Sequence, residues 1–210
     1  ITGKNDNAAK FGGDGYIDVD SDALYASDEF TISAWINWDG SSGVNAIVGN
    51  DISGDAQSRG IIFFVDGSNG VLRTNSNVCA VVGSKDKPVT ANAWHHVAFV
   101  KGNGNAQVYL DGELIGSDDV QFGVETRVPF RIGGSQKSGG GLSYPFHGAI
   151  DEVKIFSAPL TAAAIAELAD KQIAATPTAV FNAATMTLSN VTSEMKYSVD
   201  GGINWIAVEE

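Results

Sequence analysis

An alternating pattern between residues 30 and 38 most strongly limits what this chain can fold into. The segment reads FTISAWINW. Successive side chains of a strand point to opposite sides, so one face of this segment carries Phe30, Ile32, Ala34 and Ile36. Further short apolar runs lie at residues 16–19, 46–49, 60–65, 94–101, 106–110, 130–132 and 148–156. Short strands at this spacing predict an all-β sandwich or barrel rather than alternating strands and helices.

Two turn signals join neighbouring strands in the middle of the chain. The segment GNGN at residues 102–105 connects the apolar runs 94–101 and 106–110, and Asp111-Gly112 then leads into residues 113–116. Gly, Asn and Asp tolerate the positive φ angles that tight hairpin turns require. The sequence therefore predicts two successive antiparallel hairpins here.

A single short helix and a small β segment are expected after the main run of strands. Thr161 follows Pro159 and can cap the segment AAAIAELADKQ at residues 162–172. Residues 173–178 resemble a linker, and β character resumes at 186–188, 195–199 and 205–208. We therefore expect one module at residues 1–172, a linker at 173–178 and a small β segment at 179–210. That last segment is either the start of a truncated second domain or a part that packs back on the first.

Charge and composition exclude several functional classes. The formal net charge is 13 − 25 = −12, whereas nucleic-acid binding and polybasic membrane binding need clustered Lys and Arg. Cys79 is the only cysteine, so an internal disulfide is impossible. No apolar run approaches the roughly 18 residues of a membrane span. The chain opens without Met or a signal peptide, which we interpret as a piece of a longer polypeptide.

Five blocks together resemble a laminin-G-like, concanavalin A-like jelly-roll module between about residues 8 and 169. They read AAKFGGDGYIDV, FTISAWINW, WHHVAFVKGNGNAQVYLDGELIGS, RIGG and FHGAIDEVKIFSAPLTAAAIAELA, in the order of the family. The resemblance implies a two-sheet antiparallel sandwich that serves as a binding module in secreted bacterial glycan-active enzymes and adhesins. The later segment MKYSVDGGINW resembles short β repeats that follow such modules in bacterial cell-surface proteins.

A structural calcium ion is also implied by the resemblance. Related jelly rolls hold Ca²⁺ where the N-terminal glycine-rich turn meets the last strand, which here places Asp14 and Asp151 as ligands. Calcium needs six to eight oxygen ligands, and glycine turns leave backbone carbonyls available. The alternative interpretations are a simple turn residue for Asp14 and a carboxylate bound to backbone amides for Asp151.

Sugar recognition calls for exposed aromatic rings beside planar polar side chains. The C–H faces of sugars stack on rings, while Asn, Asp and Arg bind the hydroxyl groups. Trp35 and Trp94 match the framework pattern of the family and are interpreted as core. The predicted carbohydrate-binding residues are Trp38, Arg59, Asn75 and Tyr144, with ordinary surface polarity as the alternative for the polar ones.

The sequence offers no catalytic pair. Glycoside hydrolysis needs two carboxylates that flank one bond, yet Glu113, Glu125 and Glu152 stand isolated. His95 and His96 are adjacent in a predicted strand and should point to opposite faces. We therefore expect a non-catalytic carbohydrate-binding module of a larger secreted or cell-surface bacterial protein, a polysaccharide-active enzyme, with polysaccharide or oligosaccharide as its partner. The alternative is an adhesin or structural spacer.

Overall fold

The computed structural model describes most of the chain as β-structure in two separate units, Ile1–Gln172 and Ile173–Glu210. Described are residues 1–4, 7–19, 29–58, 60–75, 80–102, 104–119, 125 and 127–170, and the strands 180–182, 187–189, 196–197 and 206–207. Of residues 80–82 only the backbone is described. The predicted linker at 173–178 lies outside these ranges.

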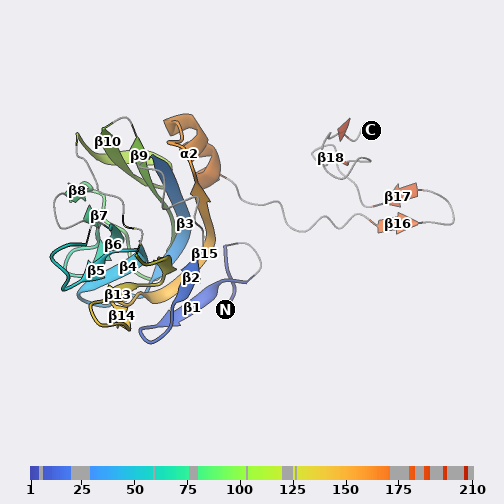
Figure 1. The fold of residues 1–210 in the computed structure, drawn as a ribbon. Coiled ribbons are helices and arrows are strands. Elements are labelled where there is room, and N and C mark those ends of the chain that lie inside the picture. Colours follow the sequence, from blue (N-terminus) through green and yellow to red (C-terminus); the bar gives the residue numbers. More distant parts are fainter. Residues whose placement is uncertain are drawn as a thin grey trace. The chain divides into compact units, whose positions relative to one another are not determined.

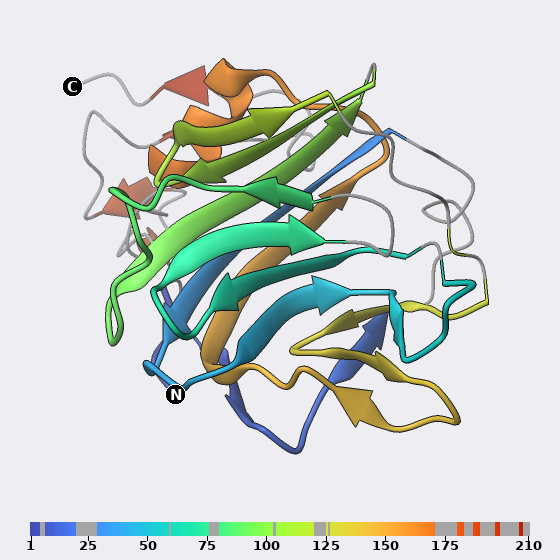
Figure 2. The same cartoon turned by 90° about the vertical axis from the view of Figure 1, so that its left-hand side faces the viewer.

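Two six-stranded sheets form the first unit (Figure 1). The first sheet has the order β1 (Ala9–Gly12), β15 (His147–Phe156), β3 (Phe30–Trp38), β9 (Trp94–Gly102), β10 (Asn105–Leu110) and β11 (Glu113–Asp118). The second has the order β2 (Ile17–Val19), β12 (Phe130–Ile132), β4 (Val44–Gly49), β6 (Ile62–Asp66), β7 (Val71–Asn75) and β8 (Ala80–Val82). Figure 2 looks onto the second sheet, with β4, β6 and β7 in front. The predicted all-β jelly-roll sandwich is confirmed.

The main core lies between these sheets and follows the predicted alternation. Phe30, Ile32, Ala34 and Ile36 all belong to it, and they meet Phe63 and Val65 of β6 from the second sheet. Phe99 of β9 contacts the rings of both Phe30 and Phe63. The side chains that alternate with these core residues therefore point outward from the sandwich, and each sheet has an outer face.

Two terminal segments cover the outer face of the first sheet. The helix α2 (Ala162–Asp170) begins after Thr161, whose hydroxyl accepts a hydrogen bond from the amide of Ala164. Its Ile165 packs on Ala98, Val100 and Tyr109, so the helix docks on the face of the sheet. At the other end of the chain, the ammonium group of Lys4 lies over the ring of Trp35.

A small third sheet stands beside the second sheet. Its order is β14 (Leu142–Ser143), β13 (Ser135–Lys137) and β5 (Ile52–Ser53). The β13–β5 pair is parallel, whereas every other described ladder is antiparallel. The second unit contributes β16 (Val180–Asn182), β17 (Thr187–Ser189), β18 (Lys196–Tyr197) and β19 (Ile206–Ala207), paired as two hairpins.

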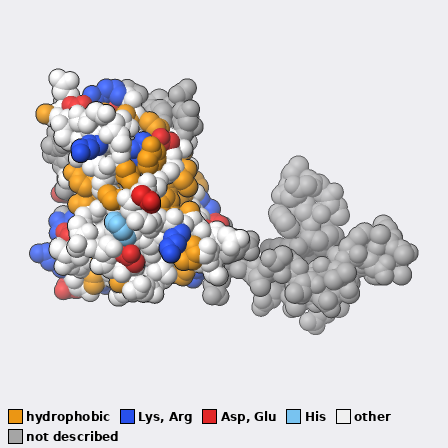
Figure 3. All heavy atoms as spheres, turned by 90° about the horizontal axis from the view of Figure 1, so that it is seen from below, with side chains coloured by type: hydrophobic (Ala, Val, Ile, Leu, Met, Phe, Trp, Pro, Cys, Tyr) orange, Lys and Arg blue, Asp and Glu red, His pale blue; other side chains and the backbone are white. Residues whose placement is uncertain are grey.

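The described part of the chain contains no helix long and apolar enough to cross a membrane. Seen from below, the first unit carries hydrophobic side chains interspersed with side chains of both charges (Figure 3). On this side, the net negative charge of the chain therefore does not appear as an unbroken acidic patch.

Candidate functional site

The outer face of β4, β6 and β7 gathers apolar and polar side chains that the sequence separates widely. Ala46, Ile62 and Phe64 form a cluster apart from the main core, and Val44 and Tyr144 pack against it. Ile62 and Phe64 alternate with core residues of β6, so they point outward. We call this set, together with Arg73 and Asn75 of β7, the outer-face cluster.

Cross-strand pairing brings the two polar residues of β7 onto this cluster. Asn75 lies opposite Ile62, and Arg73 lies opposite Phe64. Directly opposed residues in an antiparallel ladder share one face of the sheet. Arg73 also forms an ion pair with Asp66, with 3.1 Å between Nη2 and Oδ2. A hydrogen bond from Ser68 and the Arg73 charge hold the pKa of Asp66 below its ordinary value, although partial burial opposes them. Ile62 and Phe64 are themselves only 6% and 8% exposed, so the face presents the half-buried ring of Tyr144 beside planar polar groups.

Tyr144 is fixed in place by both its backbone and its hydroxyl group. Its carbonyl oxygen accepts a hydrogen bond from the amide of Ala46 at 3.1 Å. Its Oη accepts one from the hydroxyl of Ser53 in β5 at 3.0 Å. Its φ is +53°, a left-handed conformation that is uncommon for a residue other than Gly. These bonds hold the half-buried ring against the outer-face cluster.

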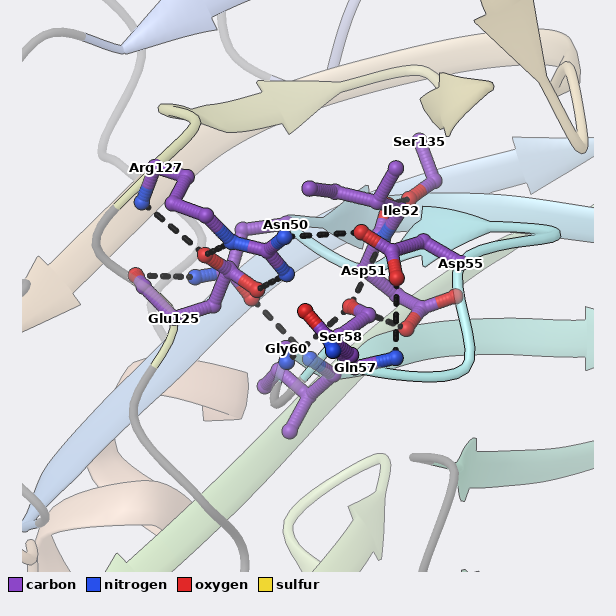
Figure 4. Close-up of polar contacts among 11 residues, drawn as sticks. Asn50, Asp51, Ile52, Asp55, Gln57, Ser58, Gly60, Glu125, Arg127 and Ser135 are labelled. Atoms are coloured by element: carbon purple, nitrogen blue, oxygen red, sulfur yellow. Dashed lines mark hydrogen bonds and ion pairs between the residues drawn. The ribbon is translucent and has the colours of Figure 1, made fainter. Parts of the chain in front are cut away.

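A buried polar network positions the loop that carries Ser53 (Figure 4). Asp51 is only 6% exposed, and its carboxylate accepts a hydrogen bond from Ser58 Oγ at 2.8 Å. The same Ser58 oxygen accepts the amide of Ile52, while the hydroxyl of Ser135 donates to the Asp51 carbonyl at 2.6 Å. Burial raises the pKa of Asp51, against the lowering effect of the Ser58 bond. The network ties β4, β5 and β13 together.

Arg127 extends this network towards the surface. Its guanidinium binds both carboxylate oxygens of Glu125, at 2.8 and 2.6 Å, and Oδ2 of Asp55 at 2.7 Å. Hydrogen bonds from Gln57 and Arg127 hold the pKa of Asp55 below its ordinary value. Asp55 and Glu125 therefore share one cation as a partner and serve a structural role. Neither forms the exposed pair that glycoside hydrolysis needs.

The predicted exposure of Trp38 is wrong. Its side chain is 5% exposed and belongs to the core between the sheets. Trp38 continues the alternation of Phe30, Ile32, Ala34 and Ile36, so its parity places it inward. A ring in this position cannot stack on a sugar, and Trp38 drops out of the candidate site. Trp35 is buried as predicted, but it lies outside the intersheet core, on the outer face of the first sheet beside His96.

Of the other predicted sugar-binding residues, the structure describes Asn75 and Tyr144. Asn75 is exposed and lies on the same face as Tyr144. Arg59 lies outside the described residues. The sequence analysis missed Ile62 and Phe64 as the buried support of Tyr144, although the unbroken apolar run at 61–65 carried the signal. A strand that is apolar at every position is packed on both faces. Here one face of β6 packs in the main core and the other packs in the outer-face cluster.

Asp14 and Asp151 stand at different levels of the β1–β15 ladder. Gly12 of β1 pairs with His147, whereas Ala9 pairs with Ile150, so Asp151 stands level with Ala8. The Asp14 carboxylate lies beside Gly12. The two acids are therefore about 13 Å apart, as calculated from the rise per residue of a strand. Calcium–oxygen distances are about 2.3–2.6 Å. Among the described residues, no group of three or more His, Cys, Asp or Glu could hold a metal ion.

Asp151 instead binds backbone amides, as the alternative interpretation has it. Its two carboxylate oxygens accept the amides of Lys4 and Glu152, each at 2.8 Å. Glu152 has a φ of +49° and lies in an irregularity of the β15–β3 ladder. Asp151 therefore stabilises a bulge and fastens the N-terminal segment to the first sheet.

His95 and His96 point to opposite faces, as predicted. His95 Nδ1 lies 2.7 Å from the carboxylate of Asp111, and Nε2 accepts the amide of Thr90. Burial raises the pKa of Asp111, but hydrogen bonds from His95 and from the His96 amide outweigh it, so the net pKa is below its ordinary value. Asp111 and Gly112 have φ angles of +49° and +81°, which confirms the predicted tight turn.

A family model for the concanavalin A-like lectin/glucanases superfamily matches residues 11–166. The chain belongs to this superfamily. Within the concanavalin A-like superfamily, chains with different functions share this sandwich, so membership gives the fold and not the ligand. No significantly similar sequence was found among the curated proteins.

Solved structures with this fold include sugar complexes. One is domain 4 of AbnA, an extracellular GH43 arabinanase from Geobacillus stearothermophilus, in complex with arabinotriose. It has a TM-score of 0.63 and 24% identity, and the match covers 81% of this chain and 80% of that one. Another is the CBM40 of a Ruminococcus gnavus IT-sialidase bound to α2,3 sialyllactose, with a TM-score of 0.63, 15% identity and coverage of 77% and 96%. A SAP-like pentraxin from Limulus polyphemus has a TM-score of 0.58, 20% identity and coverage of 77% and 80%. At these identities the likeness shows the fold alone.

Proposed function

We propose that the chain is a non-catalytic carbohydrate-binding module of a larger secreted or cell-surface bacterial protein that acts on polysaccharides. The observation that carries this proposal is the outer-face cluster. The half-buried ring of Tyr144 packs against the buried Phe64 and Ile62, and Arg73 and Asn75 lie on the same face of the sheet. A sugar offers a C–H face to such a surface and hydroxyl groups to such polar side chains. The sugar complexes of the arabinanase domain and the sialidase CBM40 support the proposal.

Such a module acts by tethering. Each sugar contact is individually weak, but a module that holds its parent protein on a polysaccharide raises the effective concentration of any linked catalytic site. The network of Asp51, Ser58 and Arg127 fits this task because it holds the Ser53–Tyr144 contact rigidly before any ligand arrives. Binding groups that are already ordered lose less conformational entropy when they bind.

The deciding experiment measures binding to a panel of insoluble polysaccharides and oligosaccharides. Wild type is compared with Tyr144→Ala and Asn75→Ala, and Asn105→Ala serves as the matched control because Asn105 lies on β10 of the first sheet. We expect each cluster variant to weaken binding about fivefold or more, by loss of a stacking or hydrogen-bonding contact, and the control to bind like wild type. Binding retained by both variants would reject this face. No binding by wild type would favour the adhesin or spacer alternative.

Calcium stays a prediction of the family resemblance, without an assigned pair of ligands. The binding experiment is therefore run with calcium and with a chelator on metal-stripped protein, and the melting temperature is recorded in both. A chelator-sensitive melting temperature would support calcium, and ligands other than the Asp14–Asp151 pair would then be sought. An unchanged one would remove calcium from the proposal.

A further inference from the structure

A second exposed aromatic ring lies on the second sheet, and no functional role has been given to it above. Tyr16 directly precedes β2 and is 42% exposed. The guanidinium carbon of Arg131 lies 3.6 Å from the centroid of its ring. This cation–π contact covers one face of the ring, and the exposed part of Tyr16 faces solvent.

The support beneath Tyr16 is rigid. Arg131 is itself only 5% exposed. Its Nε and Nη2 bind the two carboxylate oxygens of Asp18 at 2.8 and 3.2 Å, and its Nη1 donates to the carbonyl of Gly141 at 2.9 Å. A bidentate Arg–carboxylate pair fixes the plane of the guanidinium. The ring that stacks on this plane is therefore held in one orientation before any ligand arrives.

Register places Tyr16 on the same outer face as the candidate site. Arg131 pairs with Asp18 of β2 on one side and with Gly49 of β4 on the other. Its neighbour Phe130 belongs to the core, so Arg131 points outward. Tyr16 has the same parity as Asp18, and it contacts Arg131 from that side.

The distance to Tyr144 is larger than a single sugar ring. The Tyr144 carbonyl binds Ala46, three residues along β4 from the Gly49 that pairs with Arg131, which is about 10 Å at the rise of a strand. The β13–β14 hairpin links the two positions, since its Gly141 carbonyl binds Arg131 and Tyr144 follows it directly. One monosaccharide cannot stack on both rings.

We propose that Tyr16 is a second stacking contact for the same polysaccharide, so that the module binds along a glycan chain over more than one sugar. This inference rests on the proposed function. The competing interpretation is that Tyr16 merely shields the buried guanidinium of Arg131 from water. The two interpretations differ in whether the ring contributes to ligand affinity.

The test uses the full chain and a series of oligosaccharides of increasing length. They are prepared from the polysaccharide that the wild-type protein binds. The variants are Tyr16→Ala and Tyr16→Leu, where Leu keeps an apolar cover over Arg131 but offers no flat ring. Tyr16→Phe keeps the ring, and Leu114→Ala is the control for an exposed apolar side chain on the first sheet. Calorimetry gives the affinities, and the melting temperature of each variant reports folding.

We expect Tyr16→Ala and Tyr16→Leu to bind the polysaccharide and the long oligosaccharides about fivefold more weakly, the size of one lost stacking contact. Tyr16→Phe and Leu114→Ala should bind like wild type, and the shortest oligosaccharides should bind all variants equally. If Tyr16→Leu binds every ligand like wild type while Tyr144→Ala does not, the ring only shields Arg131 and the inference is overturned. An equal loss of affinity for oligosaccharides of every length would show that binding does not extend along the glycan chain, which overturns the inference. Failure of the wild type to bind any glycan overturns the proposed function, and this inference with it.

Discussion

His96 is a buried residue whose ionisation differs strongly from that of an exposed side chain. It is 1% exposed, and its Nε2 lies 2.8 Å from the hydroxyl of Ser33. Burial lowers its pKa to about 4, with Lys154 adding to the effect and Asp111 opposing it. The imidazole is therefore neutral in the folded protein throughout the mildly acidic range.

This burial predicts a loss of stability on acidification. The unfolded chain takes up a proton on His96 as the pH falls below about 6.5, while the folded chain does so only near pH 4. The stability contributed by the neutral imidazole is complete above the unfolded pKa and declines as the pH falls towards the folded pKa, by about 3 kcal/mol in total. Urea unfolding at about pH 7 and about pH 4.5 measures it.

The control for this prediction is a pair of variants. His96→Gln is less stable at neutral pH because it disturbs a buried site, but its stability should change less between the two pH values. His95→Gln should keep the wild-type decline. An equally steep decline in His96→Gln would assign the effect to other groups and contradict the prediction.

Parity places individual residues correctly only when it is followed to the end of a strand, and it says nothing of stacking between strands. Asn75 lies on the predicted kind of surface, and Trp38 would have been placed in the core had its alternation been extended by one step. Tyr16 could not be recognised from sequence, because its partner Arg131 is 115 residues away and the contact exists only once β2 pairs with β12. The spacing of the two acids of the expected calcium site has a related origin, since the register that separates them is not written in either motif.

Among the elements, β15 has the tightest backbone requirement. Gly148 pairs with Trp38 in β3 and has a φ of +132°. A Cβ at this position would overlap the carbonyl oxygen of Asn37 in the neighbouring strand. We therefore expect Gly148→Ala to destabilise the first unit by about 3 kcal/mol or more, since it combines backbone strain with overpacking.

Gly139 provides a control of similar conformation without the clash. Its φ is +85°, and a Cβ there would have nothing within 4 Å. Gly139→Ala should cost only the strain of the left-handed backbone, about 1–2 kcal/mol. Chemical denaturation of both variants separates the two effects, and equal losses would show that the overlap with Asn37 is relieved by movement of β15.

At the level of elements, the longer strands, the apolar strands β2 and β12 and the helix were predictable, and the strands of the small third sheet were not. The residues 162–170 are helical, with Thr161 as the cap, as predicted. The strands β5, β13 and β14 have two or three residues each, too few to show a period of two. They nevertheless carry the Ser53 contact to Tyr144, so the support of the candidate site came from the part of the sequence with the weakest signal.

At the scale of the whole molecule, the first unit should fold without the second. Every ladder of the two large sheets closes within residues 9–156, and the buried clusters end at Ile165. A chain ending at residue 172 should therefore show a melting temperature within a few degrees of the corresponding transition in the full chain. Calorimetry of both chains tests this, and a truncated chain that unfolds or melts much earlier would show that residues 173–210 stabilise the sandwich.

Fold and family were predictable from the whole sequence because both depend on blocks that recur in order. The face available to a ligand was not, because it depends on which outer surface other segments cover. That choice is made by contacts such as Ile165 on Tyr109 and Lys4 on Trp35, which no periodicity reveals.

Because terminal segments cover the first sheet, the two outer faces of the sandwich are not equivalent. The N-terminal segment and α2 both lie against that sheet, so both attach on its side of the sandwich. The outer face of β4, β6 and β7 then points away from both attachment points. A ligand on that face would therefore displace neither of these segments when it binds.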